Sequence, residues 1–183
     1  MKGRRIIMEE KFICLIAMFD EDTNKKFKLI NDELKKNGLS DTSLTPHITL
    51  AAYEGVEEKE LCDYIEKICS ENGKVEINFN HMGLFSLDVA FLAPQVSKDL
   101  TELHCKVHEK YEDKCGEVGF KYTVKSKSWV PHATIIIDDN EEKILKSLPI
   151  INKNFEPFKG KIVSLGLYEF YPMREIKVLK FMK

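Results

Sequence analysis

A five-residue pattern that occurs twice constrains the fold of this chain more than any other feature. In a sequence of 183 residues the copies stand 85 positions apart, and they read Pro46-His47-Ile48-Thr49-Leu50 and Pro131-His132-Ala133-Thr134-Ile135. Proline makes up about 5% of residues in proteins, so a proline before both histidines has a chance probability of roughly 1 in 400. We therefore interpret the copies as equivalent parts of a duplicated chain.

Each copy begins a predicted strand, because aliphatic residues follow both threonines and proline is tolerated at the first position of a strand. Side chains two positions apart on a strand point to the same face. This predicts His47 beside Thr49 and His132 beside Thr134. Two such pairs at a common cleft would form a symmetric acid/base site, with a hydroxyl donor beside each imidazole.

The rest of the chain predicts helices and strands in a repeated order. Apolar residues at helical spacing predict helices over residues 22–37, 57–72, 98–115 and 140–148. Apolar runs predict strands over residues 12–19, 47–53, 75–86, 89–96, 132–138, 158–170 and 175–182. Residues 117–130 are predicted to be a loop or an irregular strand. The order helix, motif strand, helix and two strands occurs twice. The similar segments Gly83-Leu84-Phe85 and Gly166-Leu167-Tyr168 stand 83 positions apart.

These observations predict an α+β fold with two pseudo-symmetric lobes. Each lobe would hold an antiparallel-rich sheet flanked by helices, and the motif strands would meet at a central cleft. We expect one domain over residues 1–183, with motifs at 47–49 and 132–134 in the two lobes and an N-terminal extension at 1–10. The chain is 43% hydrophobic, which is enough for a substantial core at this length.

Composition limits the partners that this chain could bind. The net charge of −2 gives no global field for a long polyanion, so we expect no binding to long duplex nucleic acid. The five cysteines form no C-x-x-C pair and are interpreted as small core residues in a reducing compartment. No apolar run reaches membrane-spanning length, and the apolar stretch after the basic start is too short for a signal peptide. We expect a cytoplasmic monomer with no membrane partner.

The paired motifs resemble those of the two-histidine (2H) phosphoesterase superfamily, which includes bacterial 2′-5′ RNA ligase-like proteins and 2′,3′-cyclic nucleotide phosphodiesterases. The resemblance covers residues 11–183. It implies a bilobal fold, phosphodiester chemistry without a metal or other cofactor, and catalytic roles for His47, Thr49, His132 and Thr134. The implied partner is a nucleotide or short RNA end that contains a cyclic or 2′-5′ phosphodiester.

The chain departs from many relatives in being poor in arginine. Arg4, Arg5 and Arg174 are its only arginines. The additional arginines that hold phosphate in some branches of the superfamily are therefore not expected here, and the class of substrate stays open.

Two imidazoles suit the opening of a cyclic phosphate. The reaction needs a nucleophile on one side of phosphorus and protonation of a leaving oxygen on the opposite side, and an imidazole can serve either role near neutral pH. The threonine hydroxyls would donate to the non-bridging oxygens as charge develops there. Because the site is pseudo-symmetric, the sequence leaves open which histidine is the acid. The reverse reaction would join RNA ends, so a ligase activity is an alternative.

Five further side chains are candidates for binding substrate. Tyr53 follows the first motif at the spacing of the same strand face, and Trp129 and Lys127 precede the second motif. Phe85 and Tyr168 occupy matching places in the two repeats. Core packing is the alternative role for each of the four aromatic residues.

Three other interpretations compete with this one. His104 and His108 are four positions apart on a predicted helix, but no third zinc ligand is evident, so we expect no metal site there. A metal-dependent hydrolase could use both motif histidines with Asp138, although Asp138 more simply caps the next helix. A catalytically idle RNA-binding module would keep the cleft only for recognition.

Overall fold

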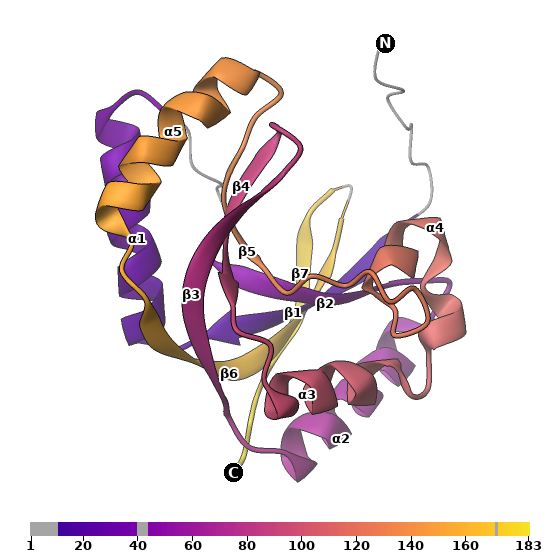
Figure 1. Ribbon diagram of the computed structural model, residues 1–183. Helices are drawn as coiled ribbons and strands as arrows, with labels where there is room; N and C mark the ends of the chain where they lie inside the picture. Colours follow the sequence, from indigo (N-terminus) through magenta and orange to yellow (C-terminus); the bar gives the residue numbers. More distant parts are fainter. Residues whose placement is uncertain (1–10, 40–43, 171) are drawn as a thin grey trace.

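The computed structural model describes residues 11–39, 44–170 and 172–183. The predicted N-terminal extension at residues 1–10 lies outside the described residues, as do Arg4 and Arg5. Within this part of the chain, seven strands form one antiparallel sheet (Figure 1). The strands are β1 (Phe12–Phe19), β2 (His47–Glu54), β3 (Val75–Phe85), β4 (Val89–Pro94), β5 (Ala133–Ile137), β6 (Phe158–Glu169) and β7 (Arg174–Lys180).

In the same part of the chain, four long helices pack against this sheet as two pairs, and a single-turn helix accompanies them. They are α1 (Glu21–Lys36), α2 (Glu58–Glu71), α3 (Lys98–His108), the single turn α4 (Gly116–Gly119) and α5 (Glu141–Asn154), with short 3₁₀ turns at Glu112–Lys114 and Phe120–Tyr122. Helices α1 and α5 lie together at one end of the molecule, and α2 and α3 lie together at the other (Figure 1). None of the helices in the described ranges is long and apolar enough to span a membrane.

The strand order is symmetric about the centre of the sheet. It runs β2-β1-β6-β3-β4-β5, with β7 beside β6, and it reads the same from both ends when β1, β2 and β3 are matched with β4, β5 and β6. The predicted α+β class and antiparallel sheet are confirmed. The pairing, however, groups each motif strand with the strand before it, so the repeated unit is strand, helix, motif strand, helix, strand. Local periodicity identifies elements, but hydrogen bonding between distant segments decides their partners.

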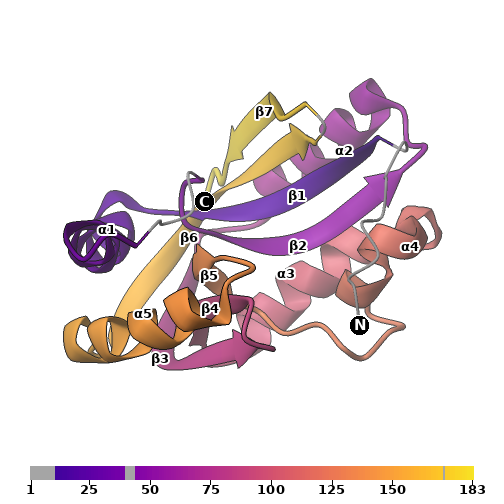
Figure 2. The same cartoon turned by 90° about the horizontal axis from the view of Figure 1, so that it is seen from above.

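The two faces of the sheet have different roles. Leu15 and Ala17 of β1 point into the main core, which the four long helices cover. Cys14 and Ile16 point to the opposite face, where α4 and the turn after it pack against β2. Figure 2 shows β1 and β2 side by side along this part of the sheet. The five cysteines are free thiols, of which Cys14, Cys69 and Cys115 are buried, as expected for core residues, while Cys62 and Cys105 are only partly buried. Burial raises the pKa of Cys14 to about 12.

Two predicted elements differ from the structure. The helix predicted over 98–115 ends at His108, and a 3₁₀ turn at Glu112–Lys114 separates it from α4, which begins at Gly116 with a φ of +51°. The helix predicted over 140–148 continues to Asn154 through Pro149. Its buried residues Ile144 and Ile151 anchor it on both sides of the proline, which offsets the backbone hydrogen bond that proline cannot donate.

Candidate active site

Both motif strands contain a β-bulge directly after the motif threonine. On β2, Thr49 pairs with Ile16 and Ala51 pairs with Leu15, so Leu50 is an extra residue. On β5, Thr134 pairs with Phe91 and Ile136 pairs with Ala90, so Ile135 is the extra residue. An extra residue shifts the alternation of side chains by one position. The motif side chains therefore point to the face opposite the main core. Beyond each bulge, the positions that would have pointed to that face point into the main core instead.

The prediction that Tyr53 lines the site is wrong for this reason. Tyr53 lies beyond the bulge and is 1% exposed within the main core. Its hydroxyl donates to the carbonyl of Val107 at 2.6 Å. The same shift applies to Asp138 beyond the second bulge, and its carboxylate binds Lys143 at 2.7 Å and the backbone of Asn140. Asp138 thus belongs to the start of α5, which leaves the metal-dependent interpretation without its carboxylate.

The two motif imidazoles are oriented in the same way. Nδ1 of His47 lies 2.8 Å from the carbonyl oxygen of Thr45, and Nδ1 of His132 lies 2.7 Å from that of Val130. A carbonyl only accepts hydrogen bonds, so Nδ1 is the donor in both rings. Among the described residues, neither Nε2 has a hydrogen-bond partner. Each acceptor belongs to the residue before the motif proline, where proline favours an extended backbone. The proline of the pattern therefore helps to set the tautomer of the histidine that follows it.

Both imidazoles are partly buried, and burial lowers the pKa of each below its usual value. The bond to the backbone carbonyl raises the pKa and partly opposes this effect in both rings. The positive charges of His47 and Lys121 lower the pKa of His132 further. The two imidazoles are thus close enough for the charge of one to affect the other.

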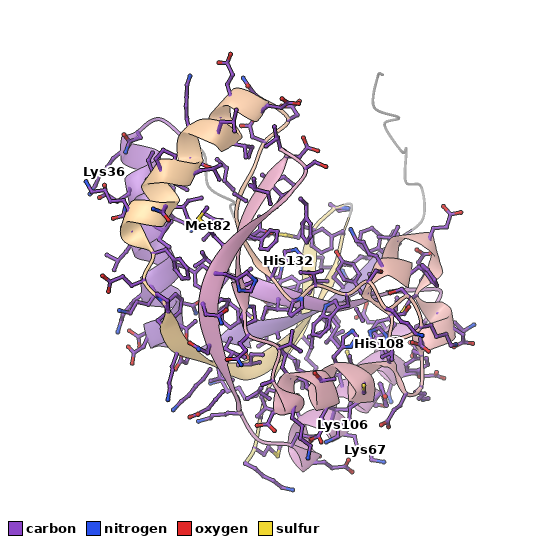
Figure 3. All side chains as sticks on the ribbon, in the orientation of Figure 1. Lys36, Lys67, Met82, Lys106, His108 and His132 are labelled. Atoms are coloured by element: carbon purple, nitrogen blue, oxygen red, sulfur yellow. The ribbon has the colours of Figure 1, made fainter. Side chains whose placement is uncertain are left out.

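Two neighbouring cavities hold the motif side chains. The larger, of about 420 Å³, is lined by Thr49 from β2, Thr134 from β5 and His132 directly before β5, so it joins the two motifs. Its other lining residues are Phe85, Val89, Lys121, Tyr122, Ser128, Val130 and Ile137. The smaller, of about 120 Å³, is lined by His47 with Ile16, Met18, Leu44, Thr45, Tyr168, Phe170 and Met173. His132 lies near the centre of the molecule (Figure 3), where the edge strands β2 and β5 approach each other.

The family model of the 2′-5′ RNA ligase superfamily matches residues 31–171, which include both motifs. The chain belongs to this superfamily. It is similar to the crystal structure of TT0787 from Thermus thermophilus, with a TM-score of 0.62, 12% identity, and coverage of 93% of this chain and 97% of that one. Among curated proteins, none matches the sequence significantly.

It is also similar to apo LigT from E. coli, with a TM-score of 0.62, 12% identity, and coverage of 96% of this chain and 99% of that one. LigT structures with 3′-AMP and with NADP⁺ give TM-scores of 0.59 and 0.57. At these identities the likeness establishes the shared fold. The resemblance to the 2H phosphoesterases that the motifs indicated is confirmed at the level of the superfamily.

Phe85 and Tyr168 occupy matching places beside the two motif imidazoles, as their positions in the repeats predicted. The Phe85 ring meets the His132 ring edge-on at a centroid distance of 4.7 Å in the larger cavity. Tyr168 shares the smaller cavity with His47, and its hydroxyl donates to Glu175 at 2.6 Å. Burial, followed by this bond, raises the pKa of Tyr168 to about 12. Their roles in binding substrate stay predictions.

Trp129 and Lys127 lie outside the residues that line either cavity, contrary to prediction. Trp129 stacks on His104 and donates through its indole N–H to the carbonyl of Thr49, so it supports the motif strand from behind. Lys127 is exposed on the loop before β5. These side chains depend on how the irregular segment 109–130 folds, which no periodic pattern in the sequence indicates.

Lys121 is the cation that the sequence interpretation missed. It lines the larger cavity, lies 5.0 Å from the centroid of the Tyr122 ring, and lowers the pKa of His132. Arg174, by contrast, forms ion pairs with Glu58 and Glu169. Among the described residues that line the two cavities, Lys121 is therefore the one lysine or arginine.

His104 and His108 have structural partners. Nε2 of His104 lies 2.7 Å from the carbonyl oxygen of Tyr122, and Nε2 of His108 lies 3.0 Å from that of Leu50. Both imidazoles are buried. Each uses its Nε2–H to satisfy a backbone carbonyl, which accounts for two histidines on one helix.

Proposed function

We propose that this protein is a metal-independent phosphodiesterase that acts on 2′,3′-cyclic phosphates or 2′-5′-linked phosphodiesters at nucleotide or RNA ends. The observation that supports this most is that the rings of His47 and His132 have the same hydrogen-bonding arrangement. Each ring has Nδ1 engaged by a backbone carbonyl and Nε2 available, and a threonine from the same strand face stands beside each. Membership of the 2′-5′ RNA ligase superfamily agrees with this class of reaction.

The two imidazoles can provide both proton transfers of the hydrolysis. Nε2 of one histidine accepts a proton from water as the water oxygen bonds to phosphorus. Nε2–H of the other donates its proton to the ribose 2′ or 3′ oxygen as the bond from that oxygen to phosphorus breaks. The product is a phosphomonoester with a free ribose hydroxyl, and exchange of one proton with solvent restores the starting state. Positioned acids and bases typically contribute about 10²–10⁴-fold.

The surrounding side chains fit a nucleotide. Thr49 and Thr134 would donate hydrogen bonds to the non-bridging phosphate oxygens, where charge develops in the transition state. Lys121 would supply the positive charge that arginine supplies elsewhere. The apolar wall of the larger cavity, with Phe85 and Val130, suits a nucleoside. The related fold of E. coli LigT has been solved with 3′-AMP and with NADP⁺.

A substrate panel in the presence of EDTA tests this proposal. The panel contains nucleoside 2′,3′-cyclic monophosphates, an oligoribonucleotide with a terminal 2′,3′-cyclic phosphate, and a 2′-5′-linked dinucleotide. We expect EDTA-insensitive hydrolysis of at least one of these, with products identified by mass spectrometry and chromatography against the 2′- and 3′-phosphate standards. The matched control is the double variant His47→Ala with His132→Ala. Loss of turnover in EDTA, or equal turnover in the double variant, would overturn the proposal.

A further inference from the structure

Two buried histidines and the partly buried Trp129 form a cluster of rings beside the first motif strand. This ring cluster consists of His104 and His108 from α3 and Trp129 from the segment before β5. The rings of His104 and Trp129 stack with a centroid distance of 3.7 Å and an interplanar angle of 2°. The rings of His104 and His108 meet at 4.8 Å. The cluster lies where α3 passes β2.

The ring cluster binds two consecutive backbone carbonyls at the bulge of β2. The indole N–H of Trp129 donates to the carbonyl of Thr49 at 3.0 Å, and Nε2 of His108 lies 3.0 Å from the carbonyl oxygen of Leu50. Strand β2 is at the edge of the sheet, so carbonyls that do not face β1 lack a strand partner. Buried carbonyls need a donor, and the ring cluster supplies it.

The same cluster holds the wall of the larger cavity. Nε2 of His104 lies 2.7 Å from the carbonyl oxygen of Tyr122, and Tyr122 and its neighbour Lys121 both line that cavity. The stacked pair of His104 and Trp129 therefore connects the strand that holds Thr49 with the wall opposite it. A change in the cluster would move both.

We infer that Trp129 is a positioning residue for the hydroxyl of Thr49, with His104 and His108 as its supports, and this inference rests on the proposed function. The bulge turns Thr49 toward the cavity and Leu50 into the core, and the indole hydrogen bond holds the bulge in that form. A hydrogen-bond donor stabilises a transition state only when it is already oriented, and small displacements of such groups reduce rates strongly. Trp129 thus acts on the chemical step without touching the substrate.

The variant Trp129→Phe isolates the indole hydrogen bond. Phenylalanine can keep a ring against His104 but has no N–H for the Thr49 carbonyl. We expect kcat to fall roughly 10- to 100-fold while KM stays unchanged. The matched control is Tyr53→Phe, which also removes a buried hydrogen bond to a backbone carbonyl, that of Val107, while the motif is left intact. We expect Tyr53→Phe to lower the melting temperature with no loss of kcat.

A double-variant cycle shows whether Trp129 acts through Thr49. If it does, Trp129→Phe costs no further activity once Thr49→Ala has removed the hydroxyl. Full additivity of the two losses, or an equal loss of kcat in Tyr53→Phe, would overturn the inference.

A readout that does not need turnover separates this inference from the proposed function. The chain has one tryptophan, so its indole N–H gives a single proton signal. The contact with Thr49 predicts slow exchange of this proton with solvent, and fast exchange would overturn the inference even in an active enzyme. A wild-type protein with a protected indole but no turnover on any substrate would instead overturn the proposed function.

Discussion

The two motif strands share the same local geometry but differ in the cavities and side chains around them. Each has a histidine whose Nδ1 binds a carbonyl two residues upstream, a threonine two residues downstream, and a bulge after that threonine. His132 nevertheless opens on a cavity of about 420 Å³ with Phe85 and Lys121, whereas His47 opens on one of about 120 Å³ with Tyr168. Among the described residues, the ring cluster donates to backbone carbonyls of the first motif strand, at Thr49 and Leu50, and to none of the second motif strand.

Under the proposed function, the features that the two sides share would serve proton transfer, and the features that differ would serve substrate recognition. Equivalent imidazoles can exchange protons in either direction, so the paired motifs alone do not orient a substrate. Under the proposed function the unequal cavities would orient it, because a nucleoside would fit the larger one better than the smaller one. Four sets of variants test how far the two sides are equivalent.

The largest effect is expected from removing either imidazole. His47→Ala and His132→Ala should each lower kcat/KM by about 10²–10⁴-fold, because each removes one proton transfer. The double variant should be little worse than either single variant, since the two groups act as a unit. Steady-state kinetics with circular dichroism as the folding control measures this. Full activity in one of the single variants would show that only one side is catalytic.

Removing a threonine hydroxyl should have the next largest effect. Loss of one donor to developing charge typically costs about 10²–10³-fold in kcat, so Thr49→Ala and Thr134→Ala should fall in this range. Thr49→Ser and Thr134→Ser keep the hydroxyl and serve as the matched controls. Similar losses on both sides would support equivalent roles for the two donors. A loss confined to Thr134 would place the phosphate within the second motif alone.

The ring cluster should make the molecule sensitive to acid. Burial, with a smaller effect from the charge of His108, lowers the pKa of His104 from 6.5 to about 4. The unfolded chain binds this proton more readily, so stability is complete above pH 6.5 and is lost as the pH falls towards about 4. The loss in unfolding free energy should approach ~3 kcal/mol.

Denaturant titrations between pH 7 and pH 4, followed by Trp129 fluorescence, measure this effect. His104→Phe keeps an aromatic ring against Trp129 and should flatten the dependence on pH. A slope that is unchanged in this variant would assign the acid sensitivity to another group.

The smallest effect, a shift in pH dependence, should reveal which imidazole is the acid. Burial lowers the pKa of both His47 and His132, so the bell-shaped profile of kcat/KM should have its maximum below pH 6.5. The charge of Lys121 contributes to the lowered pKa of His132, so Lys121→Gln should raise that pKa. If His132 is the acid, the alkaline limb moves to higher pH; if it is the base, the acidic limb does.

Lys127→Gln is the matched control for this measurement, because Lys127 is an exposed lysine of the same segment that does not line the cavity. It should leave both limbs unchanged. Equal shifts in the two variants would mean that Lys121 acts only through the overall charge of the protein.

The sequence by itself determined which residues form the repeated motifs and which segments form most of the strands. A spacing of two predicts His47 and Thr49 on one strand face, and matching positions in the two repeats pointed to Phe85 and Tyr168, which line the cavities of His132 and His47. These inferences depend on local alternation and on comparison of the two copies. Both kinds of information are present in the order of residues.

Tertiary structure alone decided which side chains beyond the motifs reach the site. The bulge after Thr49 places Tyr53 in the core, because the number of residues opposite a partner strand depends on that partner. Trp129 contacts the first motif strand, and Lys121 lines the larger cavity, because the irregular segment before β5 packs against α3 and β2. Strand register and the path of a non-periodic segment depend on contacts between residues far apart in the chain, and those contacts leave no local pattern in the sequence.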